Sequence, residues 1–186
     1  MKAELQYDMR DDVRAGSQMS YAALARGAVL GVVGGLAGTV VMDLVMFGTF
    51  WAVGLPPVIG FSIIGDTAAG FLTLLGIAMA GSLPLGAAVQ CLTGMVVGGA
   101  FGAAVSRVDA LRTDTIKKDV VLAVVCIEVL SQPIAATAPI ILKMTASQTL
   151  QWLGASAAMH LIWGSVLGLV LSYGLRLATA AKPGRS

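Results

Sequence analysis

Four long apolar stretches, separated by shorter segments rich in polar residues, glycine or proline, run along the chain. They cover approximately residues 26–54, 84–106, 120–142 and 149–175. Each reaches the roughly 20 apolar residues that an α-helix needs to cross a hydrocarbon core of about 30 Å. The pattern predicts an all-α polytopic membrane protein whose membrane domain, residues 26–178, is a four-helix transmembrane bundle.

The segment between the first two stretches, residues 55–83, has a different character. Its one continuous apolar run extends from Phe71 to Ala80, and prolines and glycines interrupt the rest. Asp66 or Thr67 has the side-chain chemistry to cap the N-terminus of a short helix that ends near Ala80. A helix of that length is too short to cross the bilayer, so we expect this segment to be interfacial or re-entrant.

Small residues recur every four positions on three of the predicted helices. Such stripes let helix backbones approach closely in lipid, where packing rather than the hydrophobic effect drives helix association. The glycines expected to make these contacts are Gly31, Gly35, Gly94, Gly98, Gly102, Gly164 and Gly168. The second and fourth helices share one design, a polar residue followed by a stripe of small residues, whereas the third has no glycine but carries Glu128 and Gln132 one turn apart. This indicates one hairpin used twice, with residues 55–83 inserted in the first copy.

The basic residues indicate which side of the membrane each end faces. Eleven of the twelve Lys and Arg residues precede the first span, join the second to the third, or follow the fourth, and only Lys143 lies opposite. Lys and Arg in short loops stay on the cytoplasmic side. We therefore predict that the N-terminal tail 1–25 and the C-terminal tail 179–186 are cytoplasmic and that residues 55–83 are extracytoplasmic.

The composition fits a lipid environment. Hydrophobic residues make up 57% and charged residues 12% of the 186 residues, far from the averages of soluble domains. A net charge of +2, without a basic stripe interleaved with aromatics, argues against nucleic acid as a partner. The expected partners are the lipid bilayer and further copies of the chain or a larger membrane complex.

Five polar residues fall near the middle of the predicted spans. Asp43, Glu128 and His160 are ionisable, and Gln90 and Gln132 lie at neighbouring depths. A carboxylate at the centre of a spanning helix costs roughly 2.5 to 3.5 kcal/mol on insertion scales, so these side chains should face the bundle interior. Because their depths nearly coincide, we expect Asp43, Glu128 and His160 to form one interacting cluster.

This cluster predicts a pathway for protons or cations. Burial disfavours the charged forms of carboxylic acids and histidine, so that proton exchange among them becomes easy near neutral pH. Pro133, directly after Gln132, should interrupt the hydrogen bonds of the third helix and free a carbonyl at a similar depth. The sequence therefore favours a proton- or cation-coupled transporter or channel.

Two other functions stay open. The polar residues could be structural, joining the helices of a non-catalytic accessory or assembly subunit at about 0.6 kcal/mol per contact. Asp43, Glu128 and His160, with nearby methionines, could instead hold a metal or cofactor. The sequence contains neither a Glu-x-x-His motif nor a second histidine, and it has no believable hydrolase, P-loop or dinucleotide fingerprint. We therefore expect no resident metal or cofactor and no enzymatic activity.

Two short pieces resemble a known group of proteins. They are residues 35–43, Gly-Leu-Ala-Gly-Thr-Val-Val-Met-Asp, and residues 160–168, His-Leu-Ile-Trp-Gly-Ser-Val-Leu-Gly. Both are similar to elements of small prokaryotic membrane proteins of the YagU-like kind. The resemblance implies a multi-pass protein of the inner (cytoplasmic) membrane. It implies little about mechanism, because that group has no settled biochemical activity.

Overall fold

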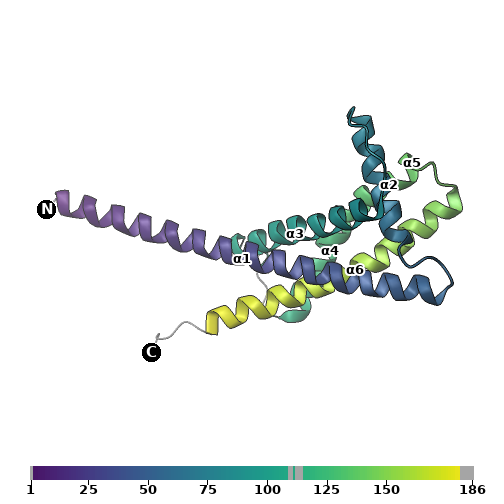
Figure 1. The fold of residues 1–186 in the computed structure, drawn as a ribbon. Coiled ribbons are helices and arrows are strands. Elements are labelled where there is room, and N and C mark those ends of the chain that lie inside the picture. Colours follow the sequence, from purple (N-terminus) through teal and green to yellow (C-terminus); the bar gives the residue numbers. More distant parts are fainter. Residues whose placement is uncertain (1, 109–110, 112–114, 181–186) are drawn as a thin grey trace.

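The protein is built from α-helices (Figure 1). The structure, a computed structural model, describes residues 2–108, 111 and 115–180, and among these residues it contains no strand. The helices are α1 (Lys2–Ala52), α2 (Ile59–Leu74), α3 (Leu83–Arg107), α4 (Ile116–Ala135), α5 (Thr137–Ile141) and α6 (Ala146–Ala180). The predicted all-α fold is confirmed.

Four segments of the chain are long and apolar enough to cross a membrane. They are Tyr21–Ala52, Leu83–Arg107, Ile116–Ile141 and Ala146–Leu177. Each overlaps one of the apolar stretches in the sequence, which confirms the number and order of the long apolar helices. Many of the exposed side chains on these helices are large and apolar, as contact with lipid requires.

The helices extend beyond several of the predicted boundaries. α1 begins at Lys2 instead of near Arg26, so the predicted tail 1–25 largely continues the first helix. Hydropathy marks where a helix enters lipid, but it does not mark where the helix ends, because Lys, Arg, Gln and Glu are also good helix formers. Most of the predicted C-terminal tail 179–186 lies outside the described residues.

The outer segment 55–83 contains one helix, which lies earlier in the chain than predicted. α2 begins at Ile59 and ends at Leu74, so Asp66 lies in its middle and not at its N-terminus. The prediction of a helix that begins at Asp66 or Thr67 is therefore wrong.

The ends of α2 are set by backbone conformation and not by side-chain capping. Its N-cap residue, Val58, makes no side-chain capping hydrogen bond. The Thr67 hydroxyl donates a hydrogen bond to the Ile63 carbonyl at 2.7 Å, one turn earlier in the same helix. A threonine bonded in this way fits inside a helix. The helix ends shortly before Gly76, whose φ of 84° suits glycine.

The third span is broken shortly after Pro133. This proline lies inside α4, which ends two residues later at Ala135. α5 then continues the span after Ala136. Because proline has no N–H, the carbonyl four residues before it receives no helical hydrogen bond from that position. The third span is thus two helical segments, as the position of Pro133 led us to expect.

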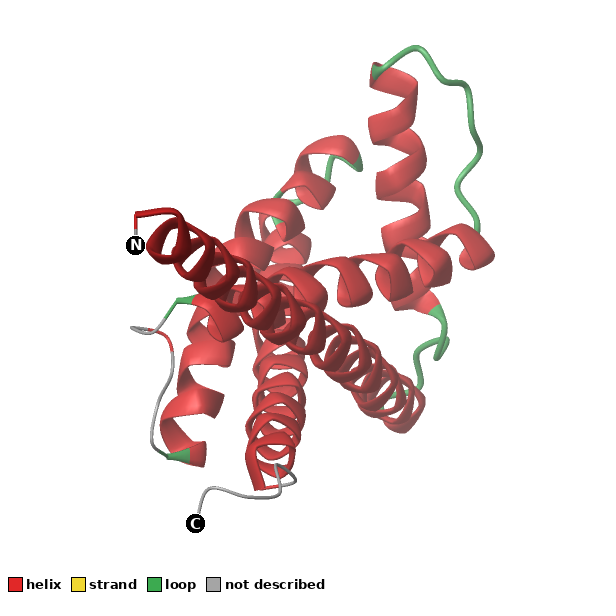
Figure 2. Cartoon of the chain, turned by 90° about the vertical axis from the view of Figure 1, so that its left-hand side faces the viewer, coloured by secondary structure: helices red, strands yellow, loops and turns green. Residues whose placement is uncertain are grey.

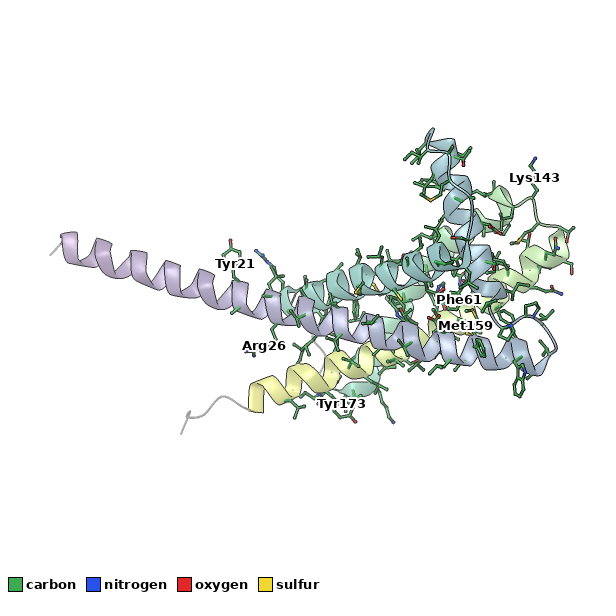
Figure 3. The ribbon with its side chains drawn as sticks, viewed as in Figure 1. Tyr21, Arg26, Phe61, Lys143, Met159 and Tyr173 are labelled. Atoms are coloured by element: carbon green, nitrogen blue, oxygen red, sulfur yellow. The ribbon has the colours of Figure 1, made fainter. Side chains whose placement is uncertain are left out.

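The long helices alternate in direction. α1 begins and α6 ends on the same side of the bundle, where α3 also ends and α4 begins, while α2 and α5 lie toward the opposite side (Figure 1). Tyr21 and Arg26 lie on the first side and Lys143 lies at the other end (Figure 3). Figure 2 views the molecule from the end that carries both termini.

Two antiparallel helix pairs make up the bundle. α1 packs along α3, α4 packs along α6, and the contact between α1 and α6 joins the pairs. A small buried cluster spans both pairs, formed by Phe101, Val105, Ala123, Ile127, Trp163, Leu167 and Leu171. Ile127 directly precedes Glu128, so this apolar cluster adjoins the polar residues near the middle of the spans.

Candidate functional site

Asp43 on α1 and Gln90 on α3 form a side-chain pair between the two helices. Nε2 of Gln90 donates a hydrogen bond to Oδ1 of Asp43. Gln90 is only 8% exposed, and Asp43 is half-buried. A donor that reaches the carboxylate offsets part of the cost of placing Asp43 inside an apolar span.

One oxygen of this pair has no partner. Oε1 of Gln90 is buried, and no described residue donates a hydrogen bond to it. The Gln90 amide therefore uses one of its donor hydrogens, while its only acceptor atom accepts no hydrogen bond. A buried acceptor left unsatisfied destabilises a protein by about 1 to 3 kcal/mol, so a purely structural pair would be expected to avoid it.

Small residues bring the two helices close enough for this pair to form. Thr39, one turn before Asp43, is buried, and its hydroxyl donates a hydrogen bond to the Gly35 carbonyl at 2.9 Å. A Cβ placed on Gly94, one turn after Gln90, would overlap the Thr39 hydroxyl. The absence of a side chain at Gly94 thus lets α3 approach α1.

Glu128 and Gln132 form a second polar pair, within α4. Nε2 of Gln132 donates a hydrogen bond to Oε2 of Glu128 at 2.9 Å across one helical turn. The other carboxylate oxygen, Oε1, is buried and has no hydrogen-bond partner among the described residues. Each helix pair therefore contains one buried acceptor oxygen that is not satisfied.

His160 on α6 lies near Glu128. Its Nδ1 is 3.4 Å from Oγ of Ser156, a long contact whose donor depends on the histidine tautomer. Gly164, one turn after His160, packs against Val124, one turn before Glu128, so the two side chains start from the same level of the helix pair. α4 and α6 thus bring an acid near an imidazole, as α1 and α3 bring an acid to an amide.

The hydrogen bonds leave the five predicted residues in three separate sets. Asp43 is bonded to Gln90, Glu128 is bonded to Gln132, and the side-chain contact of His160 is with Ser156. The single cluster expected from their depths stays a prediction about energetic coupling, since these contacts do not by themselves connect Asp43 to the other two ionisable residues. In the described part of the chain no group of three His, Cys, Asp and Glu side chains could hold a metal ion.

The expected packing glycines of α1 and α3 lie where the two backbones touch. A Cβ on one of these glycines would overlap a carbonyl oxygen of the facing helix, so a side chain could fit only if the helices moved apart. Each glycine meets two positions of the other helix: Gly98 lies against Gly31 and Gly35, Gly102 lies against Gly27 and Gly31, and Gly35 also lies against Gly94.

The glycines of α6 face valines of α4. A Cβ on Gly164 would lie 2.8 Å from Cα of Val124, and a Cβ on Gly168 would lie 2.7 Å from Cα of Val120. Both distances are shorter than an ordinary van der Waals contact. These glycines therefore set the spacing of the second helix pair.

Trp163 links the two helix pairs, although the sequence analysis did not select it. Its Nε1 donates a hydrogen bond to the Gly35 carbonyl at 2.7 Å, and the residue is 5% exposed. Gly38 makes room for the ring, because a Cβ there would lie 2.9 Å from Nε1. The sequence could have indicated this role, because a tryptophan in the middle of an apolar span has an indole N–H that needs a hydrogen-bond partner when it is buried.

A further polar group lies where α4 begins and α6 ends, and the sequence analysis did not predict it as a group. The Ser172 hydroxyl donates a hydrogen bond to Oδ2 of Asp119 at 2.7 Å. Nη2 of Arg176 lies 3.6 Å from the same oxygen. Spacing in the sequence relates Ser172 to Arg176 but cannot relate either to Asp119, because Asp119 lies on another helix.

Comparisons with known proteins find no match. This holds for protein-family models, for curated proteins and for solved structures. The resemblance of residues 35–43 and 160–168 to YagU-like membrane proteins therefore stays a prediction.

Proposed function

We propose that this protein moves protons or small cations across a membrane, as a coupled transporter or a channel. The observation that supports the proposal is the presence of two unsatisfied acceptor oxygens, Gln90 Oε1 and Glu128 Oε1, buried inside apolar helices. A proton on the neighbouring acid, or a bound cation, would supply the donor or positive charge that these oxygens lack.

The chemistry of the Asp43–Gln90 pair suits a proton. An ionised Asp43 accepts a hydrogen bond from Nε2 of Gln90, which is the arrangement in the structure. A protonated Asp43 has an O–H that can donate to Oε1 of Gln90 once the amide turns over. The same two residues can thus stabilise both charge states of the acid, as a site that gains and loses a proton requires.

An accessory subunit fits the arrangement less well. Buried polar residues that only join helices are expected to satisfy one another's hydrogen bonds. A subunit that binds a larger membrane partner is expected to keep a stripe of small residues on its outer face. Here Gly98 and Gly168 are buried within the helix pairs, and exposed positions on α4 carry Val121 and Val125.

Ion flux into liposomes tests this proposal. A dye trapped in the liposomes reports proton uptake under a pH gradient, and a second series applies a Na⁺ or K⁺ gradient at constant pH. We expect the wild type to exceed empty liposomes and the variants Asp43→Asn and Glu128→Gln to lose most of that flux. Asp66→Asn removes an exposed carboxylate outside the spans, so this control should keep the flux.

Folded wild-type protein that carries neither protons nor cations would contradict the proposal. Purification in mild detergent would then separate the other options. A larger membrane protein present in stoichiometric amount would indicate an accessory subunit, whereas further copies of this chain alone would indicate a homo-oligomer of another function.

We also propose that the protein resides in a prokaryotic inner membrane with both termini in the cytoplasm. Arg26 lies at the end of the bundle that carries the termini, and Lys143 lies at the opposite end (Figure 3). Labelling of single cysteines in a background without Cys91 and Cys126 tests the orientation. We expect Lys118→Cys to react from the cytoplasm and Ser147→Cys from outside, and the reverse pattern would contradict it.

The proposed place of α2 is the outer interface of the membrane. Figures 1 and 2 show α2 standing across the direction of α1. Its 16 residues are too few to span the bilayer, and Leu74 near its end is 76% exposed. A fluorophore on Leu74→Cys should be quenched by spin-labelled lipids placed near the headgroups, and quenching only by a water-soluble agent would contradict this location.

A further inference from the structure

We infer that α1–α3 and α4–α6 are two copies of one hairpin, and that each copy carries its own acid site. The sites are Asp43 with Gln90 and Glu128 with His160. The inference rests on the proposed function for its ligand, a proton or small cation. The equivalence of the two sites rests on how the helices pack.

In the first copy, three contacts follow one another along the helices in four-residue steps. They join Asp43 to Gln90, Thr39 to Gly94, and Gly35 to Gly98. Four residues correspond to about one helical turn, so successive contacts are one turn apart. Residue numbers fall along α1 and rise along α3, as in an antiparallel pair, and we call this series of three contacts a ladder.

The second copy contains the same ladder. Val124 packs against Gly164 and Val120 packs against Gly168, and one turn further along the two helices Glu128 and His160 lie at the same level. Each residue on α4 is 85 positions after its counterpart on α1, and each residue on α6 is 70 positions after its counterpart on α3. The same two shifts relate all three levels of the ladder.

This agreement goes beyond the geometry of any antiparallel helix pair. Every such pair has contacts one turn apart, but packing alone does not place an acid and a polar partner at the same level in both. In each copy the polar partner, Gln90 or His160, lies on the second helix one turn before the first of two packing glycines, and the acid lies opposite it on the first helix. Each copy also has one unsatisfied acceptor oxygen at this level, which lies on the second helix in the first copy (Gln90 Oε1) and on the first helix in the second copy (Glu128 Oε1).

The partner residues give the two sites different chemistry. Gln90 can donate or accept a hydrogen bond but does not take up a proton, so the first site can only hold a proton on Asp43. His160 can take up a proton on its ring nitrogen. The second site therefore contains two groups that can each hold a proton, the Glu128 carboxylate and the His160 ring.

Double-mutant cycles on unfolding in mild detergent test the two sites without any need for transport. The pairs within a copy are Asp43→Asn with Gln90→Leu and Glu128→Gln with His160→Leu. The pair across copies is Asp43→Asn with His160→Leu. Within a copy, we expect the unfolding constant of the double variant to differ about threefold or more from the product of the single effects. Across copies, we expect agreement within about twofold.

Coupling of Asp43 to His160 as strong as that within the copies would overturn the inference and favour a single cluster. Additive effects within a copy would overturn the site in that copy. If a leucine variant does not fold, Gln90→Glu and His160→Gln replace it, because both keep a polar side chain. A wild type without flux that still shows coupling within each copy would refute the proposed function and leave the duplicated sites standing.

Discussion

The two helix pairs share a register but differ in how closely their backbones approach. Between α1 and α3 glycine faces glycine, as at Gly31 and Gly98, whereas between α4 and α6 glycine faces valine. The first pair forms a hydrogen bond from one helix to the other, between Gln90 and Asp43, while Glu128 accepts its hydrogen bond from Gln132 on its own helix. Close backbones thus favour pairing between helices, and wider spacing leaves each side chain to a partner on its own helix.

The largest expected effect comes from adding bulk to the glycine–glycine contact. Gly31→Val would force α1 and α3 apart, because its Cβ would overlap the Gly98 carbonyl, which cannot rotate away. We expect the free energy of unfolding to fall by roughly 3 kcal/mol or more, as in severe overpacking. The measurement is unfolding by SDS in mild detergent.

The matched control for that variant is Gly48→Val on the same helix. A Cβ on Gly48 would have no neighbour within 4 Å, so this variant should unfold like the wild type. Equal losses in the two variants would show that close approach of α1 and α3 is not what their glycines provide.

A smaller effect is expected in the second pair. Gly164→Ala would place a methyl group 2.8 Å from Cα of Val124, a milder overlap than that between a Cβ on Gly31 and the Gly98 carbonyl oxygen. We expect a loss of about 1 to 2 kcal/mol in the same unfolding measurement. Gly154→Ala is the control, because a Cβ there would meet no neighbour within 4 Å. A loss at Gly164 larger than that of Gly31→Ala would reverse the comparison between the pairs.

The smallest effect is expected at the junction between the pairs. Trp163→Phe removes the hydrogen bond from Nε1 to the Gly35 carbonyl but keeps an aromatic ring. We expect a loss of about 0.6 to 1 kcal/mol, typical of one hydrogen bond between membrane helices. Trp51→Phe, at a position that is 75% exposed, should change stability less, and the opposite order would argue that this bond does not hold the pairs together.

Much of the fold could be predicted from the sequence, because apolar length alone locates helices that can cross a membrane. The outer segment could not, since the capping chemistry of Asp66 and Thr67 competes with packing that only the folded chain contains. Gly65 lies against the Ser82 carbonyl, and a Cβ there would overlap it. That contact holds the middle of α2 against the start of α3, so the helix includes residues well before Asp66.

The candidate site shows a similar limit. Depth along a helix follows from counting residues, so the mid-span position of Asp43, Gln90, Glu128 and His160 could be predicted. The direction in which each side chain points depends on how each helix is rotated about its axis, and hydropathy fixes that rotation poorly when small residues are spread around the helix. For this reason the sequence could place these residues at one depth but could not show that Asp43 is bonded to Gln90 and Glu128 to Gln132.

The buried position of Trp163 gives the protein an optical reporter of its own. Indole emission shifts to longer wavelength when the ring becomes exposed to water, and Trp163 is 5% exposed at the contact between the two helix pairs. In a chain in which Trp51 and Trp152 are replaced by Phe, all tryptophan emission would come from this contact. The colour of that emission would then follow, in real time and without an attached dye, whether the two halves of the bundle separate as an ion gradient is applied.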